Sequence, residues 1–79
     1  MDKEKLILNI DKLHTTNMGI KRIQNNLNIH EDVVYFCKKM IINKRSIIKR
    51  IGKNYYCEID SIIITVNASS YTIITAHKK

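Results

Sequence analysis

The chain has 79 residues, of which 14 are basic and 7 are acidic, giving a formal net charge of +7. This length predicts one domain over residues 1–79, and such a small domain is marginally stable alone because it buries a limited share of its surface. The charge is spread over both halves of the chain, so it predicts attraction to polyanions, with RNA foremost, or else a solubilising surface. We expect no signal peptide, no membrane association and no disordered segment.

Three helices are predicted in the first half of the chain, over residues 3–13, 16–27 and 30–42. In the first helix, Leu6 and Ile10 recur at helical spacing behind Asp2, which is a candidate N-cap. Asn28 is predicted to end the second helix and to cap the third in a capping-box arrangement. Gly19 is expected to let another backbone approach the second helix closely.

From Ser46 onward the apolar pattern alternates in the manner of strands. Strands are predicted over residues 47–51, 54–60, 62–67 and 71–77. Gly52-Lys53 and Asp60-Ser61 are predicted as tight turns, which would make successive strands antiparallel.

The alternation assigns two faces to this sheet. The more apolar face should pack on the helices and carries Tyr55, Cys57, Ile59, Ile62, Ile64, Val66 and Ile74. The open face carries Tyr56, Glu58, Thr65, Asn67, Tyr71, Thr75 and His77. The sequence therefore predicts an α+β fold, with two or three N-terminal helices packed on one face of a four-stranded antiparallel sheet.

The two cysteines, Cys37 and Cys57, lie 20 residues apart without the spacing of a zinc site. Both fall on predicted apolar faces, so we interpret them as buried, reduced thiols of a cytoplasmic protein. The sequence also has only two glycines, no Gly-rich phosphate loop, and seven scattered acidic residues. We therefore expect neither a cofactor nor a metal site.

RNA cleavage remains as candidate chemistry, because RNA supplies its own 2′-hydroxyl nucleophile and requires only an acid, a base and cations. An imidazole suits the acid and base roles because its ordinary pKa of about 6.5 lies near working pH. His77, at the end of the last strand, and His14, just before the second helix, are the candidate catalytic residues. The free N–H groups at the start of that helix would bind a phosphate beside His14.

The candidate phosphate and RNA contacts are Lys78, Arg50, Arg22, Lys21, Tyr71 and Thr75. The histidines and the helix cations also fit solvated surface positions, where they would carry no function. His30 is expected to precede the third helix without a catalytic role.

Two segments resemble known signatures. Residues 13–27, LHTTNMGIKRIQNNL, resemble LHTTxxGxxRIxxNL, and residues 65–78, TVNASSYTIITAHK, resemble TVNAxSYTIITAHK. Together they resemble a family of small bacterial proteins of unknown function. The order of helices and strands is also similar to that of the RelE-like and barnase-like toxin ribonucleases, whose catalytic residues project from the open sheet face. That likeness implies RNA cleavage by the strand ending in Thr75-Ala76-His77, although the two central strands lack the cations that RelE-like enzymes use.

The leading expectation is a metal-independent endoribonuclease of the toxin type, in which His77 and His14 share the acid and base work. One alternative is a nucleic-acid-binding module without catalysis, whose binding would weaken steeply with salt. The other is a small regulator or inhibitor that binds a protein partner, such as a cognate antitoxin, or that forms a homodimer through an edge strand.

Overall fold

The computed structural model describes residues 2–79. Its helical elements are α1 (Asp2–Leu8), the 3₁₀ segment η1 (Ile10–Lys12), α2 (Asn17–Leu27) and α3 (Val33–Ile42). Its strands are β1 (Ile47–Ile51), β2 (Asn54–Ile59), β3 (Ile62–Asn67) and β4 (Ile73–Lys78). The helices precede the strands and every strand pair is antiparallel, so the predicted α+β fold class is confirmed. None of the helices within residues 2–79 is long and apolar enough to cross a membrane.

The strands follow one another across the sheet in chain order, β1-β2-β3-β4. Gly52 has a φ of 59° in the β1–β2 turn, and Asp60 and Ser61 have φ angles of 49° and 65° in the β2–β3 turn. Positive φ in two-residue turns matches the twist of the flanking strands. The end of β1, the start of β2, the end of β3 and the start of β4 therefore share one end of the sheet.

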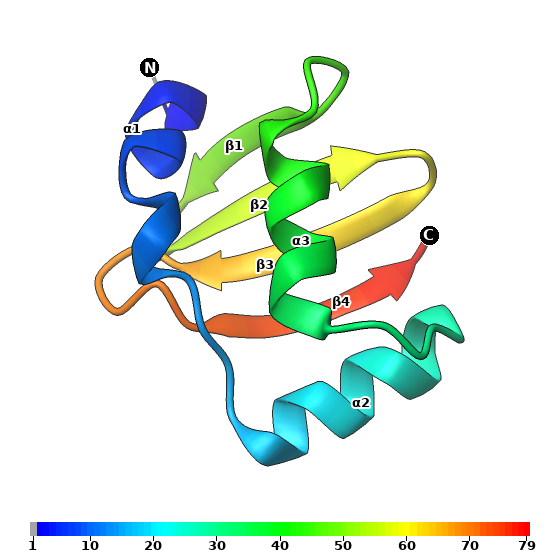
Figure 1. Cartoon of the computed structure of the whole chain (residues 1–79). Helices are drawn as coiled ribbons and strands as arrows, with labels where there is room; N and C mark the ends of the chain where they lie inside the picture. The colour runs from blue at the N-terminus through cyan, green and yellow to red at the C-terminus, as the bar shows by residue number, and fades with distance from the viewer. Residues whose placement is uncertain (1) are drawn as a thin grey trace.

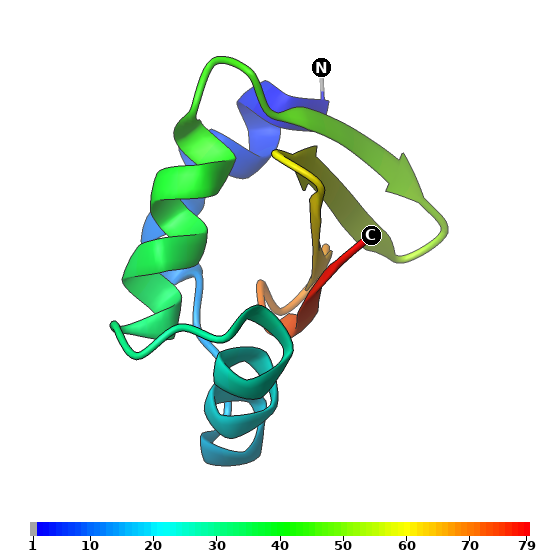
Figure 2. The same ribbon diagram turned by 90° about the vertical axis from the view of Figure 1, so that its right-hand side faces the viewer.

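The helices lie on one side of this sheet. Figure 1 shows α3 lying across the sheet, with α2 alongside β4 and α1 beside β1. Figure 2 shows that the described helices leave the opposite face uncovered and that the β1–β2 hairpin extends away from them. Between the two layers lie Leu6, Ile23, Cys37, Tyr55 and Ile64, each at most 1% exposed. Removing such side chains from water is the main force that holds the layers together.

The predicted first helix, residues 3–13, is divided into α1 and η1. The break lies at Asn9, whose side-chain amide donates a hydrogen bond to the Lys5 carbonyl at 2.9 Å. Asn competes for backbone hydrogen bonds in this way, so it favours helix ends over helix interiors. Leu13 then adopts extended angles, which carry His14 away from the helix and toward the sheet.

The caps of α2 and α3 correct part of the sequence interpretation. Thr16 caps α2, because its hydroxyl accepts from the Gly19 N–H at 3.0 Å. Asn28 does end α2, in the left-handed conformation, but it does not cap α3. That cap is Asp32, whose carboxylate accepts from the Tyr35 N–H, so the predicted capping box is wrong. A left-handed residue cannot also take the extended angles of an N-cap.

An irregularity in β4 overturns two further predictions. Val66 pairs with Ile73 while its neighbour Thr65 pairs with Thr75, so Ile74 is an extra residue opposite no partner. Such a bulge reverses the faces of the residues on one side of it. Ile73 is therefore buried at 1% exposure, whereas Ile74, predicted to face the helices, is 39% exposed. The regular alternation assumed from residue 71 onward is wrong because of this bulge.

Candidate functional site

The two candidate catalytic histidines lie at opposite ends of β4. His14 forms a parallel bridge with Thr72, just before β4 begins, and His77 pairs with Ile63 near its end. Thr72 and His77 are five positions apart along extended chain, which corresponds to about 16 Å. The fold therefore does not bring the two imidazoles to one phosphate.

His77 is exposed on the open face of the sheet, on the same side of β4 as Thr75. Across this face, Glu58 forms an ion pair with Lys79. The hydrogen bond from Lys79, together with its charge, holds the pKa of the Glu58 carboxyl below its usual range. Lys78 follows His77 in the chain, but strand alternation places it on the opposite face of the sheet, so the two do not share the open face.

Tyr71 was expected on the open face beside Thr75 and His77, and this expectation is wrong. The residue precedes β4, has a φ of 59° and is 9% exposed within the core cluster. A left-handed conformation at a bulky residue costs about 1–3 kcal/mol and persists only where the surroundings enforce it. The Lys12 ammonium lies 5.6 Å from the centre of the Tyr71 ring.

The other predicted phosphate contacts are dispersed. Lys21 and Arg22 are exposed on α2, which packs along β4 on the helical side of the sheet. Arg50 lies at the far edge, on β1, where its side chain donates to the Gly52 carbonyl at 2.9 Å. Lys21 and Arg22 thus share the surface of α2, whereas Arg50 lies at the opposite edge of the sheet, and none of the three forms a common site with His77.

Positive charge is instead concentrated in and around β1. Residues 44–53 contain five basic residues and no acidic one. Within residues 2–79, only Arg45 of these five forms an ion pair, with Asp60 at 2.9 Å. Ile47 and Ile51, which are 60% and 61% exposed, flank Lys49 along β1. Lys49 also lies opposite Tyr56 of β2 on the open face.

We call this region the β1 surface. Ile47, Lys49, Ile51 and Tyr56 share the open face, and Lys53 lies in the β1–β2 turn. The surface also includes Arg50, which pairs with Tyr55 and therefore lies around the strand edge, on the side of the helices. It is placed at the edge of the sheet, on the hairpin that extends away from the helices (Figure 2). The sequence contains the signal for it, since the basic residues recur within ten positions.

A second polar group surrounds His14. Its Nδ1 lies 2.9 Å from the Lys12 carbonyl, and its Nε2 lies 3.1 Å from the Thr72 hydroxyl. That hydroxyl is 2.7 Å from the hydroxyl of Ser70, which is 3.2 Å from the Asn67 side-chain oxygen. We call Lys12, His14, Asn67, Ser70 and Thr72 the His14 cluster.

Sequence reasoning missed Ser70 and Thr72, because nothing local connects them to a histidine 58 positions away from Thr72. The available signal was the resemblance itself. His14 lies in the first signature-like segment and both hydroxyls lie in the second, so the fold joins the two segments at this cluster.

A family described as "Protein of unknown function (DUF3781)" matches residues 7–77. The chain belongs to this family. The match includes both the β1 surface and the His14 cluster. No curated protein and no solved structure matched the chain, so neither comparison supports the relationship to RelE-like ribonucleases.

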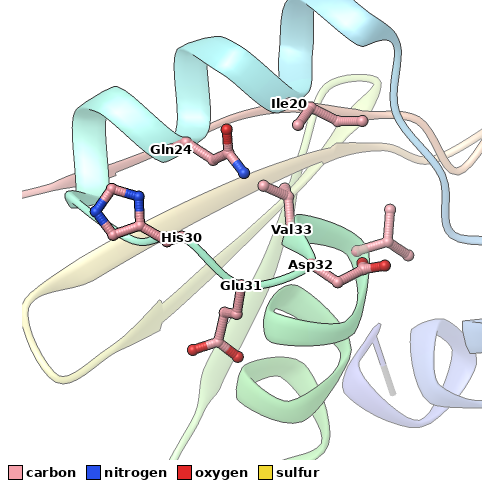
Figure 3. A pocket seen from close by; sticks show the side chains of 7 residues that line it. Ile20, Gln24, His30, Glu31, Asp32 and Val33 are labelled. Atoms are coloured by element: carbon pink, nitrogen blue, oxygen red, sulfur yellow. The ribbon is translucent and has the colours of Figure 1, made fainter.

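A hollow of about 370 Å³ lies between α2 and α3 and includes His30, Glu31 and Asp32 in its lining. Figure 3 shows these three side chains pointing in different directions. Asp32 caps α3, and Glu31 pairs with Lys39 at 3.0 Å. Among residues 2–79, no three His, Cys, Asp or Glu side chains come together as a metal site would require.

Both cysteines are free and fully buried in the core. Burial raises the pKa of the Cys37 thiol to about 12, with a further contribution from neighbouring Cys57. Burial also raises the pKa of Cys57 to about 11, although a hydrogen bond with Ser46 and the charge of Lys3 oppose the shift. The thiolate is the reactive form, so these thiols are chemically inert in the folded protein.

Proposed function

We propose that this protein binds single-stranded nucleic acid, with RNA as the partner, on the β1 surface. The observation that carries the proposal is a stretch of five basic and no acidic residues, residues 44–53, on an edge strand whose open face the described helices leave uncovered. Lys49, Arg50 and Lys53 have no ion-pair partner within residues 2–79. Cations without acidic partners are free to contact phosphates and to release the counterions of the nucleic acid.

The apolar side chains of the same surface favour a single strand. Ile47 and Ile51 are exposed, and half-buried Tyr56 lies on the open face between them. Unpaired bases stack on aromatic side chains and lie against apolar ones, whereas the bases of a duplex are already stacked on each other. A basic edge next to this apolar face therefore suits a flexible strand with exposed bases.

RNA cleavage is a second candidate function. The observation that favours it is the exposed imidazole of His77 on the same open face, beside Thr75. In this version one imidazole removes the proton of the 2′-hydroxyl and water protonates the leaving oxygen. We also propose a cytoplasmic location, because both buried cysteines are kept as free thiols.

Fluorescence anisotropy with a short labelled oligouridine tests the binding proposal. Three phosphate contacts with a single strand predict a slope of about −2 for log K against log salt, and an affinity about 20-fold weaker at about 200 mM than at about 50 mM salt. Replacing Lys49, Arg50 and Lys53 by Gln should remove most of this slope.

A matched control replaces Lys21, Arg22 and Lys38 by Gln, which removes the same charge from the helical side. This control should retain the slope of the natural protein, because those cations lie away from the β1 surface. Equal losses in the two triple variants would show that binding depends on net charge alone and would contradict the proposed site. Gel analysis of the same RNA detects cleavage, which His77→Asn should abolish if the second candidate is correct.

A further inference from the structure

The His14 cluster has a defined proton arrangement. A backbone carbonyl only accepts hydrogen bonds, so the contact with the Lys12 carbonyl places a proton on Nδ1 of His14. In a neutral ring the other nitrogen, Nε2, is then an acceptor, and the Thr72 hydroxyl donates to it at 3.1 Å. Since Thr72 uses its single proton there, the hydroxyl of Ser70 shares its own proton between two acceptors, the Thr72 oxygen at 2.7 Å and the Asn67 side-chain oxygen at 3.2 Å.

The contacts thus run from the Thr72 hydroxyl to the His14 imidazole and from the imidazole to the Lys12 carbonyl, which orients the ring. This is the arrangement that activates a hydroxyl nucleophile, with the imidazole as general base. The Ser70 hydroxyl adds a donor that stabilises negative charge on the Thr72 oxygen.

The backbone holds this geometry independently of the side chains. The His14 N–H donates to the Tyr71 carbonyl at 3.2 Å, and the Ile73 N–H donates to the His14 carbonyl at 2.7 Å. Thr72 lies between these two contacts, and Tyr71, which accepts the first of them, has a left-handed conformation. Strained backbone of this kind is often found where a side chain must be aimed at a reacting group. His14 and Ser70 are exposed and Thr72 is half-buried, so a small molecule can reach the hydroxyls.

We propose that Thr72 is the nucleophile of an acyl-transfer site that hydrolyses small carboxylic esters, with His14 as its general base. This activity would be separate from nucleic-acid binding on the β1 surface. Acyl transfer is the favoured class because a hydroxyl and an imidazole perform it without a metal ion.

In the first step the Thr72 oxygen bonds to the ester carbonyl carbon, and its proton moves to Nε2 of His14. The bond from that carbon to the leaving oxygen breaks, and the leaving oxygen takes the proton from Nε2 to become an alcohol. Water then attacks the acylated Thr72 and gives one proton to Nε2. The bond between the Thr72 oxygen and the acyl carbon breaks, Thr72 regains its proton, and a carboxylic acid leaves.

The test measures hydrolysis of p-nitrophenyl acetate by the full-length protein. Thr72→Val and His14→Asn should each lower the rate of ester hydrolysis by at least about 100-fold, which is the lower end of the usual contribution of a general base. The Asn side chain can still donate to the Lys12 carbonyl, so it removes the base without removing the orienting contact. Thr72→Ser keeps the hydroxyl and should retain activity within about tenfold, and His30→Asn controls for loss of a surface imidazole.

Acid quenching during turnover, followed by peptide mass spectrometry, identifies the acylated residue. An acetyl group on Thr72 that is absent from His14→Asn is the expected result. Hydrolysis that is equal in the natural protein and in Thr72→Val, or an acetyl group confined to lysines, would overturn the proposal. Circular dichroism and urea unfolding of Thr72→Val and His14→Asn show that they fold. This control does not depend on RNA binding, so failure here is separable from failure of the proposed binding function.

Discussion

The two buried thiols predict a loss of stability in alkaline solution. Cys37 of α3 and Cys57 of β2 are both 0% exposed in the core between the helices and the sheet. An unfolded chain exposes them, and their thiols then ionise near their ordinary pKa of about 9. In the folded protein, burial raises the pKa to about 12 for Cys37 and to about 11 for Cys57.

The sign follows from which state binds more protons. Between about pH 9 and pH 11 the folded protein keeps both thiol protons while the unfolded chain loses them, so rising pH favours unfolding. The stabilisation is fully present below pH 9 and is lost as the pH rises through the folded-state values. At about pH 10 an unfolded thiol with a pKa of about 9 gains about 1.4 kcal/mol by ionising, or about 3 kcal/mol for the pair.

Urea unfolding followed by circular dichroism, at about pH 7 and about pH 10 with a reductant, measures this loss. The matched control replaces Cys37 and Cys57 by Ala. The double variant should be less stable at pH 7, because truncation leaves cavities, but its loss between the two pH values should be smaller by about 3 kcal/mol. All other ionisable groups are common to both proteins, so the difference isolates the thiols. An identical loss in both proteins would show that the thiols do not resist ionisation in the fold, and would refute the reasoning.

Two further predictions concern the packing of β4 and α2. In chemical denaturation, Ile73→Ala should lower the free energy of unfolding by about 3 kcal/mol and Ile74→Ala by about 0.5 kcal/mol. The reason is that the bulge buries the side chain of Ile73 and exposes that of Ile74. Equal losses would contradict the bulge. A Cβ at Gly19 would lie 2.3 Å from the Thr15 hydroxyl, which donates to the Ile73 carbonyl at 2.9 Å. Gly19→Ala should therefore stabilise the fold by about 1 kcal/mol in a Thr15→Ala background and give no gain in the natural protein. A double-mutant cycle in which the two substitutions are simply additive would argue against this contact.

Local signals explain why much of the fold was predictable. The two-residue turns at Gly52 and at Asp60-Ser61 depend on the residues within the turn, and they set the antiparallel order of β1, β2 and β3. The alternation of apolar and polar residues also predicted which face of β2 packs against the helices, as the burial of Tyr55 and Cys57 confirms.

Features that depend on competition between neighbours were predicted less well. Asn28 and Asp32 are both good N-cap residues. Asn28 takes the left-handed conformation that ends α2, and α3 begins only at Val33, directly after Asp32. Gly19 was expected to admit another backbone, but the heavy atoms nearest to a Cβ placed there belong to the side chains of Thr15 and Thr16, one turn away in the chain. The bulge at Ile74 has no local sequence signal, since Ile73 and Ile74 are identical in type.

The sequence by itself determined the antiparallel sheet, the apolar face of its central strands and the basic stretch around β1. Each of these rests on residues that are close together in the chain. The tertiary structure alone decided that His14 and His77 are kept apart, and that His14 lies instead beside Thr72, 58 positions along the chain. The physical reason is that the chain between His14 and Thr72 folds into two helices and three strands before it reaches the edge strand β4. No local sequence pattern indicates which earlier residue will lie beside the start of that strand.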